Sequence, residues 1–364
     1  MINYIDEFRD PGLARKMAGI LSEYKGKPIS VMEVCGTHTM ALSRFGIRNI
    51  LPEGIRLVSG PGCPVCVTPV SYINAALELA RHPKTIIATF GDMIRVPGTE
   101  SSLQREKAMG ADIRIVYSPL DALKIAAEHP DSRVVFLSIG FETTTPGAAL
   151  TIRKAKADGI GNFSMLMANK TMPEVIKLLA SDSSVKIDAY LYPGNVCAIT
   201  GTKLYGELAE QYGISGAVTG FEPLDLLYSL IYLVSALKGE RAFVYNQYSR
   251  VVKPEGNPAA LDVMQEVFEP RDASWRGIGN IPGSGLKIVN SYEEYDAWKV
   301  YSLHQREIPE PAGCKCGEIL KGRTTPASCG LFGTACSPDN PVGPCMVSSE
   351  GTCAAFYKYG GNNV

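Results

Sequence analysis

The fold is constrained most by a regular alternation of short apolar runs with helical segments between residues 29 and 248. This alternation is typical of βαβ units, in which helices join parallel strands and cover the sheet. The predicted strands are residues 29–34, 55–59, 85–90, 113–117, 134–139, 163–168, 189–192 and 217–219. The clearest predicted helices are residues 71–81, 120–128, 147–157, 173–180 and 223–237. The fold class is therefore predicted to be α/β.

A chain of 364 residues is longer than one usual domain of roughly 100–200 residues. The strands favour two similar open parallel sheets, although one large sheet would also accommodate them. We predict an N-terminal helical segment, residues 1–28, that packs on the C-terminal domain, and two α/β domains at 29–130 and 131–250. Frequent glycine and proline after residue 250 predict a loop-rich third domain over 251–364.

Charge and hydropathy exclude several functions. The 36 basic and 37 acidic residues nearly cancel, so no overall field draws the chain to nucleic acid or to an anionic membrane. Residues 1–11 lack the basic start and apolar run of a secretory signal. The longest apolar stretch, residues 226–237, is well short of the roughly 20 residues that span a bilayer. We expect a cytoplasmic protein.

The ten cysteines carry the functional prediction. In a small secreted protein they would suggest disulfides, but in a large chain in a reducing compartment clustered cysteines bind metal or exchange electrons. Six of the ten lie within the last fifty or so residues. Metal ligation, rather than a large apolar core, is expected to fix the conformation of this tail.

The first predicted thiol site lies in two turns that follow neighbouring strands. One turn carries Cys35 and His38, and the other carries Cys63 and Cys66 just before a helix. Open α/β sheets bind ligands at these strand ends, and a helix N-terminus favours thiolate. The three sulfurs are predicted to bind iron or zinc, with a redox disulfide as the alternative for the Cys-x-x-Cys pair. For His38 we favour proton transfer or orientation of Cys35 over direct ligation.

The second predicted thiol site is the tail. Its cysteines are Cys314, Cys316, Cys329, Cys336, Cys345 and Cys353. A cubane iron–sulfur cluster uses four thiolates and would leave two for a redox pair, whereas a zinc site would also use four. The spacing does not decide between these alternatives or select the four ligands, and structural disulfides are a further alternative.

Two carboxylates near strand ends complete the candidate residues. Asp92 and Glu142 follow predicted strands and are expected either to assist the metal cleft as hydrogen-bond acceptors or proton carriers, or to cap helices. No Walker-type phosphate-binding pattern accompanies them, so ATP hydrolysis is not predicted.

Several of these segments together resemble one family. The segments Cys35-Gly-Thr-His-Thr, Gly60-Pro-Gly-Cys-Pro-Val-Cys66, Thr89-Phe-Gly-Asp-Met93 and Gly140-Phe-Glu-Thr-Thr-Thr-Pro146, followed by the cysteine-rich tail, resemble the HypD family of hydrogenase maturation proteins. The resemblance runs from about residue 33 to the end of the chain and includes the order of the motifs. It implies two similar α/β domains and a third domain with a [4Fe-4S] cluster.

The resemblance also implies a function. Family members act with HypC as a scaffold on which an iron ion receives cyanide, delivered by HypE, and carbon monoxide for the [NiFe]-hydrogenase site. Such a scaffold is not a conventional turnover enzyme. Carried over, Cys35, Cys63 and Cys66 are the iron-site thiols, with Cys35 the direct ligand.

The tail is also similar to ferredoxin–thioredoxin reductase. By that likeness Cys314, Cys329, Cys336 and Cys353 hold the cluster, and Cys316 and Cys345 form the exchanging pair that passes electrons to Cys63 and Cys66. Two other classes stay open, namely a stand-alone iron–sulfur disulfide reductase and a zinc-stabilised binding module.

Overall fold

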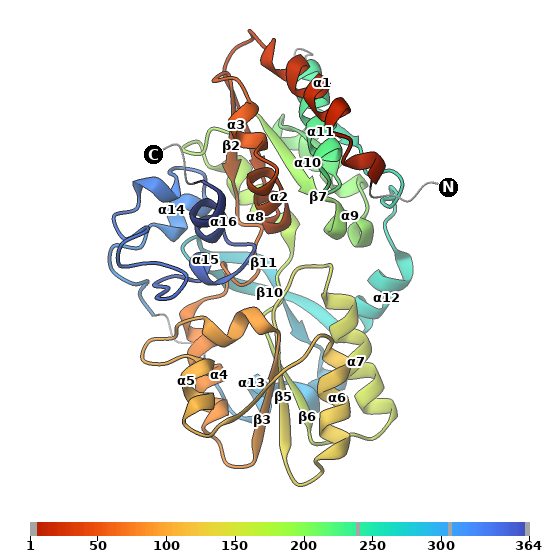
Figure 1. Ribbon diagram of the computed structural model, residues 1–364. Helices are drawn as coiled ribbons and strands as arrows, with labels where there is room; N and C mark the ends of the chain where they lie inside the picture. Colours follow the sequence, from red (N-terminus) through yellow and green to blue (C-terminus); the bar gives the residue numbers. More distant parts are fainter. Residues whose placement is uncertain (1–5, 238–240, 305–307, 361–364) are drawn as a thin grey trace.

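The computed structural model describes residues 6–237, 241–304 and 308–360 and contains two parallel sheets, one above the other in Figure 1. We call each sheet with its helices a lobe. The first lobe has strand order β2-β1-β7-β8-β9 and the second has β4-β3-β5-β6. The strands are β1 (Ile29–Glu33), β2 (Ile55–Ser59), β3 (Thr85–Thr89), β4 (Asp112–Ile115), β5 (Arg133–Ser138), β6 (Phe163–Met167), β7 (Ala189–Pro193), β8 (Ser215–Thr219) and β9 (Val244–Asn246).

Helices connect the strands. They are α1 (Pro11–Ser22), α2 (Gly36–Arg44), α3 (Ile47–Ile50), α4 (Val70–Ala80), α5 (Leu103–Ala108), α6 (Pro119–Glu128), α7 (Thr145–Ala157), α8 (Met172–Ser181), α9 (Gly194–Thr200), α10 (Lys203–Tyr212) and α11 (Pro223–Ala236), with the short 3-10 helices η1 (Asp6–Phe8) and η2 (Gly91–Arg95). The strands β3, β6, β7 and β8 are buried along their whole length. Parallel strands that helices cover on both faces are apolar along their whole length, which explains the continuous apolar runs in the sequence.

The two lobes share one topology. In each lobe the first strand lies next to the edge strand, which is the second in chain order, and the third and fourth strands follow on its other side. The first lobe adds β9 beyond its fourth strand. The prediction of two similar parallel sheets is therefore confirmed.

The predicted boundary at residues 130/131 is wrong, because β3 pairs with β5 across it. The second lobe is instead inserted between β2 and β7, since β1 pairs in parallel with β7 far along the chain. Strand pairing depends on contacts that are distant in sequence, which local composition does not report.

The region after residue 250 is more regular than predicted. It contains α12 (Pro258–Val267) and a long antiparallel hairpin of β10 (Phe268–Trp275) and β11 (Gly279–Ile288). The hairpin runs between the lobes in Figure 1, and α12 packs on α7. It is followed by η3 (Asn290–Tyr295) and α13 (Ala297–Val300), which pack on β6. The glycines that suggested loops lie largely in the hairpin, where Gly277, at its turn, has a positive φ of 71°.

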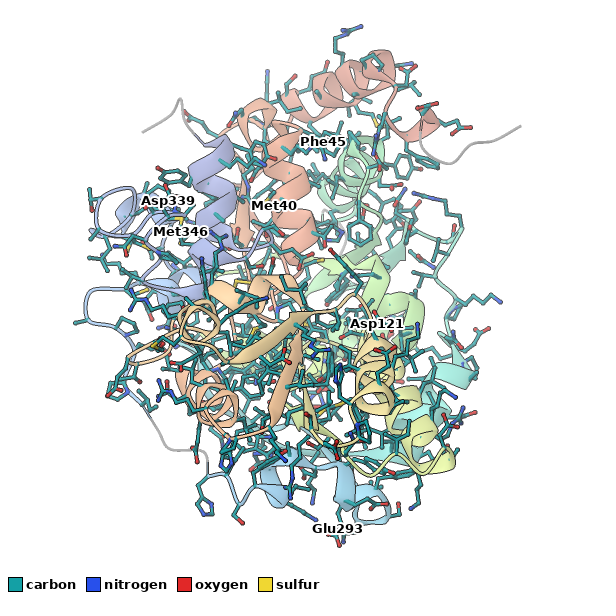
Figure 2. The ribbon with its side chains drawn as sticks, turned by 60° about the horizontal axis from the view of Figure 1, so that its bottom comes forward. Met40, Phe45, Asp121, Glu293, Asp339 and Met346 are labelled. Atoms are coloured by element: carbon teal, nitrogen blue, oxygen red, sulfur yellow. A yellow bond between two sulfur atoms is a disulfide. The ribbon has the colours of Figure 1, made fainter. Side chains whose placement is uncertain are left out.

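The cysteine-rich tail is the loop-rich part. Its elements are the short α14 (Cys316–Leu320), η4 (Pro326–Ser328), α15 (Pro344–Val347) and α16 (Thr352–Tyr359). The helix α16 packs on α2 of the first lobe. Figure 2 labels Met346 on α15 and Met40 on α2 on the same side of the molecule. Val34, Ile87 and Ile319 belong to one buried apolar cluster, so both lobes and the tail share a core.

The N-terminal helix packs elsewhere than predicted. A helix is present at α1, but it contacts α11 of the first lobe rather than the C-terminal region. Its Leu21 is buried with Leu226 and Leu230 of α11. The apolar run that forms α11 therefore provides the docking face for α1. Residues 1–5 of the predicted segment lie outside the described residues. None of the helices described is long and apolar enough to cross a membrane.

Candidate functional site

A cavity of about 480 Å³ opens where the carboxyl ends of strands from both sheets meet. We call it the cleft. Segments that follow β1, β2, β3, β4, β5 and β7 line it, and Ser348 and Glu350 of the tail close one side. The carboxyl ends of parallel strands are where α/β sheets place their ligands. The predicted location of the site, at the strand ends, agrees with this cavity.

Cys35 lies in the cleft wall at the start of α2. The backbone N–H of Gly36 donates to the carbonyl oxygen of Gly62 at 3.0 Å, which joins the two cysteine-bearing turns. A Cβ on Gly62 would lie 2.1 Å from the backbone nitrogen of Cys35, so only glycine permits this approach. The Gly60-Pro-Gly-Cys turn thus fixes the position of Cys35.

The Cys35 side chain is only 5% exposed. Burial, and secondarily the nearby carboxylate of Glu350, raises the pKa of this thiol to about 12. Hydrogen bonds from the Thr37 and His38 backbone and from the Thr37 hydroxyl act in the opposite direction. The free chain therefore holds Cys35 as a thiol at neutral pH, and a bound metal ion would release its proton because metals bind the thiolate.

Cys63 and Cys66 form a disulfide. Both are buried behind the cleft wall, with Pro64 and Val65 between them lining the cavity. A disulfide sulfur is not a thiolate, so Cys63 and Cys66 would bind a metal ion only after reduction of this bond. Metal binding and redox exchange by this pair both stay predictions.

His38 does not line the cleft. Its imidazole is fully buried, and Nε2 lies 3.1 Å from the carbonyl oxygen of Gly220, in the turn after β8. Burial lowers the pKa of His38 to about 4, so the ring is neutral and donates through Nε2 to that carbonyl. The ring also packs against Phe221 at 4.9 Å. The structure thus places His38 in a packing position that joins α2 to the turn after β8.

The two predicted carboxylates have different surroundings. Asp92 lines the cleft and accepts a hydrogen bond of 2.8 Å from the Ser348 hydroxyl of the tail. Glu142 points away from the cleft and accepts from the backbone N–H of Met172 at 2.9 Å, at the start of α8. Burial raises the pKa of Glu142 to about 7. Its Oε1 accepts from the first residue of α8, whereas Oε2 is buried without a hydrogen-bond partner, so both predicted roles of Glu142 stay predictions.

Glu350 is a cleft residue that sequence reasoning missed. Its carboxylate accepts a hydrogen bond from the Thr37 hydroxyl, and burial raises its pKa. A Cβ on Gly36 would lie 2.5 Å from the Cβ of Glu350, so the tail and α2 are in close contact beside Cys35. Glu350 follows no strand and belongs to no recognised motif. Only its position before Cys353, among the tail cysteines, could have drawn attention to it.

The six tail cysteines surround one small cavity of about 20 Å³. The sulfurs of Cys316 and Cys345 lie 2.7 Å apart and are buried. In this coupled pair the pKa of Cys316 is lowered, chiefly by the hydrogen bond from Cys345, whose own pKa is raised. Burial raises the pKa of Cys314 to about 11. Cys316 is thus the more easily ionised sulfur of the pair.

The donor set fits an iron–sulfur cluster. The six cysteines that line the cavity are soft sulfur donors, and apolar side chains line the rest of it. Four of them stand outside the close Cys316–Cys345 pair, namely Cys314, Cys329, Cys336 and Cys353. Over the residues described, no three His, Cys, Asp or Glu side chains stand close enough together to hold a single metal ion. A cubane cluster takes one thiolate at each of its four irons, and the four cysteines outside the close pair supply that number.

Fold and site together define an α/β protein with two parallel sheets, a cleft with a buried thiol, and a cysteine-rich tail that closes the cleft. The model of the HypD family, described as "Hydrogenase formation hypA family", matches residues 12–360. The chain belongs to the HypD family, so the resemblance found in the sequence is confirmed.

Curated relatives cover almost the whole chain. The chain is 45% identical to "Hydrogenase maturation factor HypD" of Cupriavidus necator, over 99% of this chain and 97% of the relative. It is 42% identical to the proteins of the same name from Rhodobacter capsulatus, over 99% of both chains, and Escherichia coli, over 98% of both. The family role is thus hydrogenase maturation.

Proposed function

We propose that this chain is a scaffold on which an iron ion, bound to Cys35 in the cleft, receives cyanide and carbon monoxide ligands for a [NiFe]-hydrogenase. HypC shares the iron through a cysteine of its own, and HypE delivers cyanide. These partners follow from the family resemblance. The chemistry belongs to a reducing compartment, the cytoplasm, since eight of the ten cysteines are free.

The proposal rests on one observation. Cys35 is a buried thiol in the wall of a cavity of about 480 Å³ that is built from strand ends of both lobes. Such a cavity has room for an iron ion with several diatomic ligands, and its side chains replace water around them. Asp92 and Glu350 lie in the same wall and are placed to accept protons or hydrogen bonds there.

We assign the tail a redox role. Cys314, Cys329, Cys336 and Cys353 would hold a [4Fe-4S] cluster, which supplies single electrons when bound. The thiolate of Cys316, once the Cys316–Cys345 pair is reduced, attacks the Cys63–Cys66 disulfide. A second attack by Cys345 then leaves Cys63 and Cys66 as thiols and the tail pair as a disulfide. Two electrons move in this exchange, which matches the reductive attachment of cyanide.

Replacing Cys345 with serine tests this relay. We expect Cys63 and Cys66 to stay oxidised in the variant under anaerobic reduction and cyanide attachment to fail. Thiol alkylation followed by mass spectrometry reports the oxidation state. Normal cyanide attachment by the variant would contradict the relay, but would leave the role of Cys35 intact.

The central experiment is anaerobic co-purification of the chain with HypC. We expect infrared bands of bound cyanide and carbon monoxide, and their absence in Cys35→Ala. Unchanged bands in that variant would overturn the proposal.

A stand-alone iron–sulfur disulfide reductase is the second candidate, favoured by the Cys63–Cys66 disulfide together with the close tail pair. It predicts thiol release from a protein disulfide without HypC, measured by a colorimetric thiol assay. A zinc-stabilised binding module predicts instead a colourless protein with zinc and no iron. Metal analysis after anaerobic purification separates these alternatives.

A further inference from the structure

Arg276 lies at the tip of the β10–β11 hairpin, between the two cysteine pairs. Its backbone N–H donates to the carbonyl oxygen of Val67, the residue after Cys66, at 2.8 Å. A Cβ on the next residue, Gly277, would lie 2.4 Å from the Cα of Gly317, the residue after Cys316. The hairpin tip therefore contacts both the disulfide segment and the start of the tail.

The guanidinium of Arg276 is buried and incompletely paired. Its side chain is 1% exposed, and Nε donates to Glu310 at 2.6 Å. Both terminal nitrogens, Nη1 and Nη2, are buried without a hydrogen-bond partner. Glu310 is 35% exposed, so water shares its charge and it balances the guanidinium only in part. A buried cation with unused donors is costly unless an anionic partner completes it.

Arg276 is adjacent to the tail segment that carries Cys316, because the next residue, Gly277, packs on that segment. A Cβ on Gly277 would lie 3.8 Å from the carbonyl carbon of Cys316, so the hairpin tip contacts the backbone of a tail cysteine. The guanidinium charge also acts on Cys316 and Cys314, although burial raises the pKa of Cys314 overall. Lys315 lies between these two cysteines in sequence but is exposed, and its Nζ donates to the carbonyl oxygen of Ser328. Arg276 and Lys315 thus differ in burial, although both are cations beside the tail.

We propose that Arg276 is the charge partner of the redox centre held by the tail cysteines, and that its positive charge and free N–H groups make that centre easier to reduce. The inference rests on the cluster assignment of the proposed function. A cubane in its oxidised form carries two negative charges with its four thiolates, and one electron from a low-potential donor raises this to three. A buried cation stabilises the more negative state more strongly, and hydrogen bonds to sulfur act in the same direction.

Glu310 carries the opposite charge to Arg276 and should have the opposite effect on the reduction potential of the centre. Because it is the carboxylate partner of Arg276, it offsets part of the positive charge near the centre. Removal of the Arg276 charge should make the centre harder to reduce, whereas removal of the Glu310 charge should make it easier to reduce. A purely structural role of either residue would not give shifts of opposite sign.

The test is a redox titration of the full chain, monitored by electron paramagnetic resonance, with dithionite as the electron donor. For Arg276→Gln we expect the ratio of reduced to oxidised centre at a fixed potential to fall about tenfold, which is about 59 mV for one electron. For Glu310→Gln we expect the ratio to rise. Lys315→Gln removes an exposed charge and should change the ratio less than twofold, because water screens that charge.

The outcomes are distinguishable. Iron and sulfide are measured first in the wild-type chain, and their absence would overturn the cluster assignment and this inference with it. A wild-type cluster whose potential is unchanged in Arg276→Gln, or shifts in the same direction in both variants, would overturn the role of Arg276 alone. If Arg276→Gln fails to fold, the direction of the potential shift in Glu310→Gln tests the proposal. That variant should fold, because Glu310 is partly exposed.

Discussion

The cleft and the tail both present thiols, but they position them by different means. In the cleft, Cys35 follows a strand that pairs on both sides, and a glycine turn packs directly on its backbone. In the tail, the longest helix has eight residues, too short to be stable alone, and six cysteines surround a very small cavity. The sheets therefore preorganise the cleft, whereas we expect the order of the tail to depend also on the cluster that its cysteines are proposed to hold.

The largest expected effect separates the cleft thiol from other buried thiols. Cys35→Ala should reduce hydrogenase maturation by about 100-fold or more, because it removes the proposed direct iron ligand. The control is Cys197→Ala, which removes a free thiol that is equally buried but is not part of the cleft wall. Hydrogenase activity of cells that carry each variant measures the difference. Equal losses in the two variants would mean that burial, not metal binding, makes Cys35 important.

Removal of iron should destabilise the tail and leave the sheets unchanged. After chelation under reducing conditions, we expect amides in residues 314–359 to exchange with deuterium about 100-fold faster, because metal binding contributes to the stability of such segments. Amides of β3 and β5 should keep their protection. Hydrogen exchange with mass spectrometry measures both regions in one sample. A tail that keeps its protection without iron would show that it folds by packing alone.

The stability of the lobes should depend on pH through Glu142. Burial raises its pKa from about 4.5 to about 7, so the folded chain keeps a proton that the unfolded chain has already released. The stability that this proton contributes is complete below about pH 4.5 and is lost as the pH rises through 7. Relative to Glu142→Gln, the free energy of unfolding should fall by on the order of 3 kcal/mol over that range. Urea titrations at several pH values measure it, and parallel pH profiles would refute the assignment.

The smallest expected effect concerns His38, which neighbours Cys35 in sequence but not in the cleft. His38→Gln should lower the free energy of unfolding by about 1 kcal/mol through the hydrogen bond to Gly220. Maturation should stay close to the wild-type level. Thermal denaturation and the cellular hydrogenase assay, run beside Cys35→Ala, separate the two residues. A maturation defect as large as that of Cys35→Ala would show that His38 takes part in the chemistry of the cleft.

Most of the fold could be predicted where the signal is local. Each of the eight predicted strands overlaps an observed strand, because short apolar runs between turns specify buried parallel strands. The helices α2, α9 and α10 were not predicted. The first two directly follow strand ends, where polar and glycine residues suggested turns. Their helical conformation is stabilised by packing on the sheets rather than by their own sequence.

The site was also predictable only where the signal is local. The motifs identified the cysteines, and the position of the cleft followed from the rule that ligands bind at strand ends. The separation of Glu142 from Asp92 could not be predicted, since both follow strands in the same manner. It depends on which side chain meets the start of α8 and which meets the tail. Glu350 and Arg276 were missed because each reaches its site only through packing of distant segments.

The sequence by itself determined the alternation of strands and helices, the two groups of cysteines and the family, because these are properties of neighbouring residues and of their order. Tertiary structure decided that the second lobe is inserted into the first, that α1 rests on α11, and that the hairpin tip contacts the segments that follow Cys66 and Cys316. These arrangements depend on burying apolar surface and pairing backbone groups between segments far apart in the chain. That energy is gained only when the whole chain has folded, so no local pattern records it.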